Sequence, residues 1–316
     1  MTTTAQHWID QTRNMLLSGY VEELLTLTTP PGSLAATTMT ITGANDSGIV
    51  PGVVIEIGSE LFYVTNVAGT TVSVMRGYAG TTAVVHNVDD IVRVSPKFPE
   101  HRIIDELNND LADLSAPDNG IFDMKTFTFT YQGGVDGYEV PGITNDQLSS
   151  IYQVTYAALG VIADEPEVIN WKLRRNRNTS VFTSGLALVL YSGVTPGRLV
   201  TAMYKSPLTP ITSSTSTKIS TGLSTTAYDL PPLGAALSLM VSTPIRREFL
   251  DAQGSSRRAE EVPPGAIAGS MRDLRSKRSI RLESEASRLA QMYPQLWHRN
   301  SAVGNTGVFA NLGRHR

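Results

Sequence analysis

Residues 263–293 read PPGAIAGSMRDLRSKRSIRLESEASRLAQMY, and this stretch decides the fold that the sequence predicts. Proline suits the first turn of a helix, because it lacks an N–H that would be unpaired there and its φ is already near the helical value. Apolar residues recur at spacings that place them on one helical face. They are Ile267, Met271, Leu274, Leu282, Leu289 and Met292. We therefore predict a helix of about thirty residues, roughly 45 Å long, which ends at Pro294.

Charged residues interrupt the apolar row of this helix. Arg278 and Glu285 fall within the row, so the pattern is not that of a coiled-coil seam. One interpretation is an amphipathic helix that packs against copies of itself or a partner, with Arg272, Arg275, Arg278 and Arg281 at the interface. The other is a terminal helix that lies across its own domain.

Composition bounds the class of protein. The chain has 316 residues, 41% of them hydrophobic and 17% charged, and a formal net charge of −3, which gives no global attraction to nucleic acid or to an anionic membrane. It has no cysteine, which fits assembly in a reducing compartment. The start lacks the order of a signal peptide, and no apolar run approaches the ~20 residues of a membrane span. We expect a soluble, multi-domain chain made inside a cell.

No catalytic signature is found in the sequence. There is no GxSxG elbow, no GxxxxGK phosphate loop, no GxGxxG after a strand and no HExxH. The five histidines lack the spacing of metal ligands. We predict no enzyme activity, no cofactor and no metal site.

The residue patterns alternate between helix and strand along the chain. Residues 5–28 are expected to form a helix, and the period changes to two between residues 35 and 94, which predicts a small antiparallel barrel or sandwich. Residues 99–115 carry a second helical stripe. Strands return between residues 122 and 211, and their alternating faces could fill a sandwich.

Two basic segments stand out. Trp171 is followed by Lys172, Arg174, Arg175 and Arg177, which either contact nucleic-acid phosphates or belong to an exposed strand and its turn; the second interpretation is preferred. Residues 295–316 contain three arginines and no acid, and we expect this tail to be disordered alone. Its apolar and basic side chains predict docking onto another protein. They are Trp297, Arg299, Val308, Phe309, Leu312, Arg314 and Arg316.

A family resemblance rests on residues 60–86, ELFYVTNVAGTTVSVMRGYAGTTAVVH. This run resembles a small β-module of tailed-bacteriophage virion proteins, in which a strand ending in an Arg-Gly turn is followed by Gly-Thr-Thr-Ala and a histidine. His86 is expected to be structural. The layout of the whole chain is similar to that of neck, or head-to-tail connector (adaptor), proteins of such phages.

The resemblance implies an α+β fold with a helical ring body. The N-terminal, middle and long C-terminal helices would pack together, with a small β-barrel inserted and a β-sandwich added. The expected divisions are a helical body at 1–33 and 96–117, a β-module at 34–95, a β-sandwich at 118–225, a helical hairpin at 226–294 and a docking tail at 295–316.

The resemblance also implies a function by binding alone. A homo-oligomeric ring, expected to be a 12-mer, would lie in the virion neck after assembly in the host cytoplasm. It would join the portal protein, on which the tail at 295–316 would dock, to a downstream neck or tail protein. DNA would pass through the ring at genome ejection, with transient non-specific contacts, and no membrane is involved. Two alternatives are a tail completion or tube-end protein, and a receptor- or carbohydrate-binding virion module.

Overall fold

The computed structural model describes residues 4–17, 22–148, 150–157, 165–191, 194–242 and 266–294. The chain divides into two compact units. One comprises Met1–Asp123 and Pro207–Gln291, and the other Met124–Ser206 and Met292–Arg316. Each unit is described by itself below.

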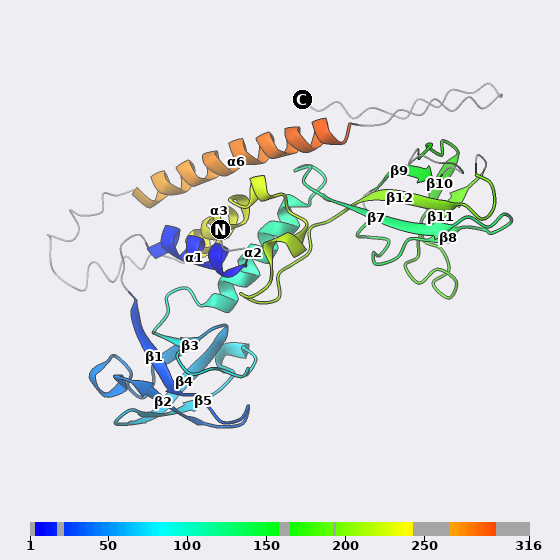
Figure 1. Cartoon of the computed structure of the whole chain (residues 1–316). Helices are drawn as coiled ribbons and strands as arrows, with labels where there is room; N and C mark the ends of the chain where they lie inside the picture. The colour runs from blue at the N-terminus through cyan, green and yellow to red at the C-terminus, as the bar shows by residue number, and fades with distance from the viewer. Residues whose placement is uncertain are drawn as a thin grey trace. The chain divides into compact units, whose positions relative to one another are not determined.

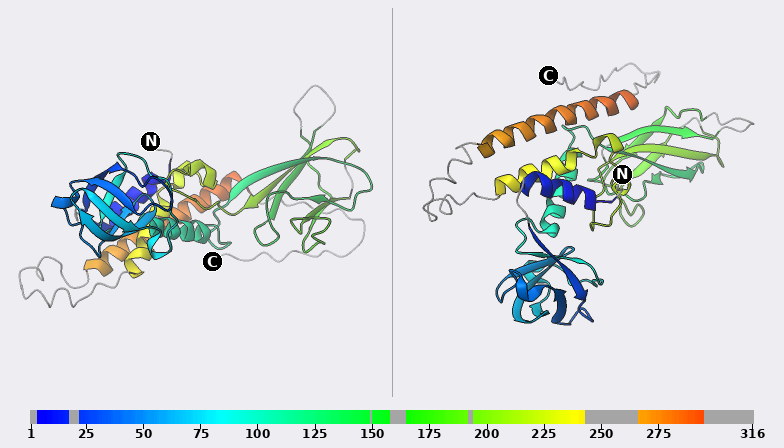
Figure 2. Two further views of the ribbon diagram at one scale, coloured as in Figure 1. Left: turned by 90° about the horizontal axis from the view of Figure 1, so that it is seen from below. Right: turned by 60° about the vertical axis from the view of Figure 1, so that its left-hand side comes forward.

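The first unit contains a closed six-stranded barrel, drawn in blue and cyan in Figures 1 and 2. Its strands are β1 (Glu23–Thr29), β2 (Thr38–Thr42), β3 (Val54–Ile57), β4 (Glu60–Ala68), β5 (Thr71–Met75) and β6 (Ile91–Val94). The order around the barrel is β1-β2-β5-β4-β3-β6, and all pairs are antiparallel. Side chains that alternate along the strands fill the interior, among them Ile41, Ile55 and Phe62, which are fully buried.

The prediction of one helix over residues 5–28 is wrong. Helix α1 spans Gln6–Leu17, and the residues from Glu23 form β1, which pairs with β2 and β6 to close the barrel. The segment ELLTLTT alternates with period two, so Leu27 is buried in the barrel core while Leu24 is half exposed. A strand between two partners satisfies its backbone groups on both sides, and this outweighs the helical spacing of its leucines.

The predicted fold class, an α+β molecule built around a helical ring body, is also wrong. By number of elements the described residues are mostly β, with twelve strands against four α-helices: α1, α2 (Glu100–Leu114), α3 (Leu230–Ser242) and α6 (Ala266–Met292). The first three are short, of 12, 15 and 13 residues, and they pack against one another beside the barrel. Among the helices described, none is both long and apolar enough to cross a bilayer.

The second unit consists of two three-stranded sheets, ordered β7-β12-β9 and β10-β11-β8. The strands are β7 (Asp123–Thr130), β8 (Tyr138–Glu139), β9 (Ser150–Tyr156), β10 (Trp171–Arg174), β11 (Ala187–Leu190) and β12 (Leu199–Ser206). Both sheets contribute to one core, in which Val154, Leu188 and Ala202 are fully buried. Such a shared core is that of a small sandwich.

A buried ionic cluster joins the barrel to helices α1 and α2 within the first unit. Glu56 on β3 accepts a hydrogen bond from Arg13 Nη2 of α1 at 2.7 Å, and also one from the backbone N–H of Glu100 at the start of α2. Arg93 Nε on β6 lies 3.8 Å from the same carboxylate. Burial raises the pKa of Glu56 to about 7, against the opposing effect of Arg13, and burial also raises the pKa of Glu100.

This cluster makes stability depend on pH. Since the pKa of Glu56 is higher in the folded chain than its ordinary 4.5, the folded state binds the extra proton and stability falls as pH rises from 4.5 to 7. Glu56 alone should remove about 2 kcal/mol of unfolding free energy between pH 5 and pH 7. Urea denaturation at both pH values measures this loss. Glu56→Gln should reduce it by that amount, and an unchanged pH dependence in the variant would refute the assignment.

Candidate functional site

Helix α6 is fastened to the rest of the first unit by arginine–carboxylate pairs. Arg278 Nη2 lies 2.6 Å from Oδ1 of Asp110 and 2.7 Å from Oδ2 of Asp113, and both acids belong to α2. Arg278 Nε donates a second hydrogen bond to Asp110 at 3.1 Å. One guanidinium therefore bridges two carboxylates one turn apart on α2.

Asp110 lies deep in this site. It is 7% exposed, and burial raises its pKa to about 7, although the Arg278 guanidinium favours the ionised form. Gly234 of α3 packs directly against the carboxyl group, so closely that even a methyl group on Gly234 would overlap it. The missing side chain of Gly234 thus makes room for Asp110 between α2 and α3.

A second set of contacts fastens the middle of α6 to the segment before α3. Arg281 Nε lies 2.7 Å from Asp229 Oδ2, and Arg281 Nη2 donates to the carbonyl of Thr226 at 2.6 Å. Thr226 Oγ1 donates to Glu285 at 3.0 Å, and Arg288 pairs with the same carboxylate at 2.5 Å. Burial alone would raise the pKa of Glu285, but the hydrogen bonds from Arg288 and Thr226 outweigh it and lower this pKa.

Few apolar side chains of α6 are buried. Among its residues whose side chains are described, Leu289 and Glu285 alone are buried, at 6% and 3% exposure. Met271, Leu274 and Leu282 of the predicted stripe are half-buried, while Met292 and Ile280 are exposed. Charged pairs therefore supply much of the specificity with which this helix is held.

The four arginines predicted at an interface divide into two groups. Arg278 and Arg281 face their own chain in the pairs just described. Arg272 and Arg275 are exposed and make no ion pair with any residue that the structure describes. All seven predicted docking residues of the tail lie outside the described residues: Trp297, Arg299, Val308, Phe309, Leu312, Arg314 and Arg316.

The stretch that carries the resemblance is organised by a buried carboxylate. Glu60 is fully buried at the start of β4 and accepts hydrogen bonds from Arg76 at 2.9 and 2.7 Å and from His86 Nε2 at 2.9 Å. The backbone N–H groups of Gly77 and Val84 donate to it at 3.3 and 3.0 Å. Burial alone would raise the pKa of Glu60, but the bonds from Arg76, Val84 and His86 lower it overall.

This arrangement explains the motif in physical terms. The Arg-Gly turn and the histidine converge on one carboxylate that holds the segment between β5 and β6 against the barrel. His86 is 6% exposed. From the sequence His86 is expected to be structural, but Glu60 is missed. The signal for Glu60 is an acid at the start of a largely apolar strand, with an arginine and a histidine following in the same motif.

The basic strand of the second unit makes contacts within its own unit. Arg175 donates to the backbone carbonyls of Asn145 and Leu148, both at 2.7 Å, and Arg174 donates to Tyr191 Oη at 3.4 Å. Lys172 is exposed and Trp171 half-buried on β10. The structure thus accounts for Arg175 as a support of a neighbouring loop, whereas Lys172 remains an exposed cation.

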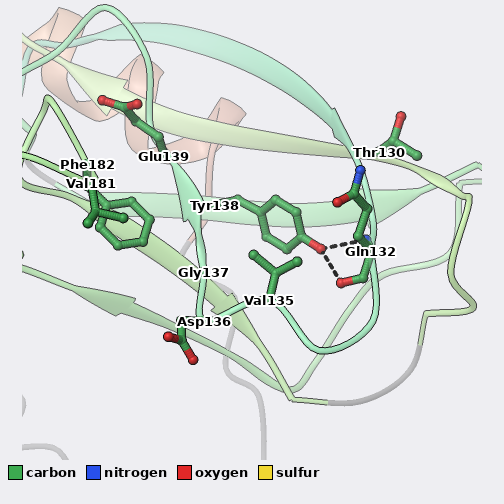
Figure 3. Close-up of a pocket in the computed structure, with 9 residues that line it drawn as sticks. All are labelled: Thr130, Gln132, Val135, Asp136, Gly137, Tyr138, Glu139, Val181 and Phe182. Atoms are coloured by element: carbon green, nitrogen blue, oxygen red, sulfur yellow. Dashed lines mark hydrogen bonds between the residues drawn. The ribbon is translucent and has the colours of Figure 1, made fainter.

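A shallow hollow of about 520 Å³ lies on the second unit (Figure 3). The Tyr138 hydroxyl donates to the carbonyl of Gln132 at 2.8 Å and accepts from the N–H of Gln132 at 2.6 Å. Phe129 stacks on the Tyr138 ring with centroids 4.0 Å apart. Tyr138, one of the two aromatic side chains that line the hollow, is therefore engaged in holding the connection between β7 and β8.

Neither the protein-family models nor the curated proteins compared with this chain give a match. The functional interpretation therefore rests on the residues and their geometry.

Proposed function

We propose that this chain is a structural virion protein, a head-to-tail adaptor that forms a ring between the portal and the next neck or tail component and surrounds the DNA channel. The observation that carries the proposal is helix α6, with 27 residues. Ion pairs of Arg278 and Arg281 fasten this helix to its own chain, while Arg272, Arg275 and Ile280 are exposed. A helix exposed in this way is suited to contact with a further chain.

The barrel gives a second line of support. The residues on which the phage resemblance rests are used to build a closed β-module, with Glu60, Arg76 and His86 at its buried polar centre. A rigid module of this kind needs no ligand or chemistry of its own to serve as a part of an assembly. Since the predicted helical body is wrong, we assign the lateral contacts of the ring to α6.

Electron microscopy of the purified protein tests this proposal. We expect closed rings with twelvefold symmetry, because an adaptor matches the portal to which it docks. Sixfold rings would favour the tail completion or tube-end alternative. A protein that stays monomeric at high concentration, alone and with portal protein, would contradict both.

A matched pair of variants tests the part of α6 in that assembly. Reversing the charge of Arg272 and Arg275 together should shift the protein from rings to monomers, since the proposal places these two exposed side chains against the neighbouring copy. Lys172→Glu, an exposed cation on β10, should leave the rings intact. Equal effects of the two variants on ring formation would show that Arg272 and Arg275 of α6 do not lie at the ring interface.

The carbohydrate-binding alternative gains no support from the hollow of Figure 3. A sugar site needs free polar groups beside an open aromatic face, whereas the Tyr138 hydroxyl and one face of its ring are used within the chain.

A further inference from the structure

The surface on which α6 lies can accept the helix from any copy of the chain. The anchoring contacts are between charged groups: Arg278 meets Asp110 and Asp113, and Arg281 meets Asp229. These carboxylates lie on α2 and just before α3, and together they form an acidic docking surface for a basic helix. Charge complementarity of this kind fixes the register of the helix and is independent of which copy donates it.

The chain connection permits exchange. Residues 243–265 lie between α3 and α6 in the sequence. Its 23 residues set an upper limit of roughly 75 Å on the distance that this connection can bridge. The covalent connection therefore does not restrict α6 to the docking surface of its own copy.

We propose that α6 exchanges between copies, so that in the assembled ring each α6 docks on the acidic surface of the neighbouring chain. The partner is thus a second copy of this protein, and the inference rests on the proposed ring. Each copy gives one helix and receives one, which is a head-to-tail contact. Repeated head-to-tail contacts close into a ring when the rotation between copies allows it.

The structure offers a direct way to trap the exchange. A Cβ atom built on Gly120 would lie 3.7 Å from Cβ of Ala286 on α6, close to the mean Cβ separation in disulfides. The chain has no cysteine of its own. Gly120→Cys and Ala286→Cys can therefore be introduced separately into two otherwise identical proteins, one of which carries a size tag.

The two proteins are mixed before ring assembly, oxidised, and separated on a non-reducing gel. Exchange predicts a disulfide-linked heterodimer that involves about half of the chains, since each helix meets the other variant at random in the ring. Each variant oxidised alone sets the background. Rings that form without heterodimers would overturn this inference and leave the proposed function intact, whereas a failure to form any ring would overturn the proposed function and the exchange with it.

A second pair of variants avoids cysteine and the left-handed backbone of Gly120 (φ 68°). Asp229→Arg alone and Arg281→Asp alone each place like charges across the docking contact. In a ring in which the two variants alternate, each α6 docks on the other variant. Arg281 of the first variant then meets Asp229 of the second, and the aspartate introduced at position 281 of the second meets the arginine introduced at position 229 of the first. Mixing should then restore the amide-exchange protection of α6 to the wild-type level, and a mixture that stays as unprotected as its components would refute exchange.

Discussion

Glu60→Ala is expected to lower the free energy of unfolding by about 3–5 kcal/mol, because it breaks a buried pair and leaves Arg76 as an uncompensated buried charge. The carboxylate is fully buried and receives bonds from Arg76, His86 and two backbone N–H groups. Arg76 and His86 side chains are only 7% and 4% exposed, so the loss of Glu60 leaves both donors largely shielded from bulk water. Urea unfolding followed by circular dichroism measures the change.

Two further variants serve as controls for the cost of Glu60→Ala. Asp118→Ala removes an exposed carboxylate from the same unit and should stay within about 0.5 kcal/mol of wild type. Glu60→Gln keeps the shape but loses the charge, and its cost should lie between those of Asp118→Ala and Glu60→Ala. A cost below about 1 kcal/mol for Glu60→Ala would show that the motif is not held by its carboxylate.

Local patterns of apolar residues could be read from the sequence, but where one segment fits both a helix and a strand the sequence did not decide between them. Strands between residues 35 and 94 follow from alternating apolar residues, and β2 to β6 are there. Residues 23–29 satisfy both a helical stripe and a strand pattern, and only the presence of two partner strands decides between them. Such partners are a property of the closed barrel and cannot be seen within the segment itself.

Of the residues at the candidate site, only those on α6 could be singled out from the sequence. Arg278 and Glu285 interrupt the apolar row of α6, and the structure shows why: both meet polar partners on the body of the unit. Their partners are far away in the sequence, Asp110 by 168 residues from Arg278, so no spacing rule connects them. A local signal for Asp110 did exist, because it lies three residues after Leu107 and four before Leu114, within the apolar stripe of α2.

Gly234 shows what sequence patterns leave out. It lies within α3, where glycine costs roughly 1 kcal/mol relative to alanine, so a propensity argument marks it as a weak point. The structure explains why glycine is present, since the lack of a side chain at Gly234 makes space for the Asp110 carboxyl group that pairs with Arg278. Close packing of α3 on α2 and docking of α6 therefore depend on the same absent methyl group.

The same glycine-to-alanine change should consequently have opposite signs in two helices. Gly234→Ala should destabilise the protein by about 3 kcal/mol, because it combines overpacking against Asp110 of α2 with a weakened Arg278–Asp110 pair. Gly269→Ala in α6 meets no atom within 4 Å and should stabilise by about 0.5–1 kcal/mol through helix propensity alone. Urea unfolding of both variants gives the two signs, and loss of amide-exchange protection in α6 should accompany only the first.

A double-mutant cycle tests the physical reason for that difference. Asp110→Ala removes the group with which the new methyl would collide, so in this background the cost of Gly234→Ala should fall by about 3 kcal/mol, a coupling expected only of side chains in direct contact. If Gly234→Ala costs as much without Asp110 as with it, the carboxyl group does not occupy the space beside Gly234. If Gly234→Ala instead stabilises the wild-type chain, as Gly269→Ala should, then α2 and α3 do not approach each other at Gly234. In that case Asp110 is not the buried partner of Arg278 described above.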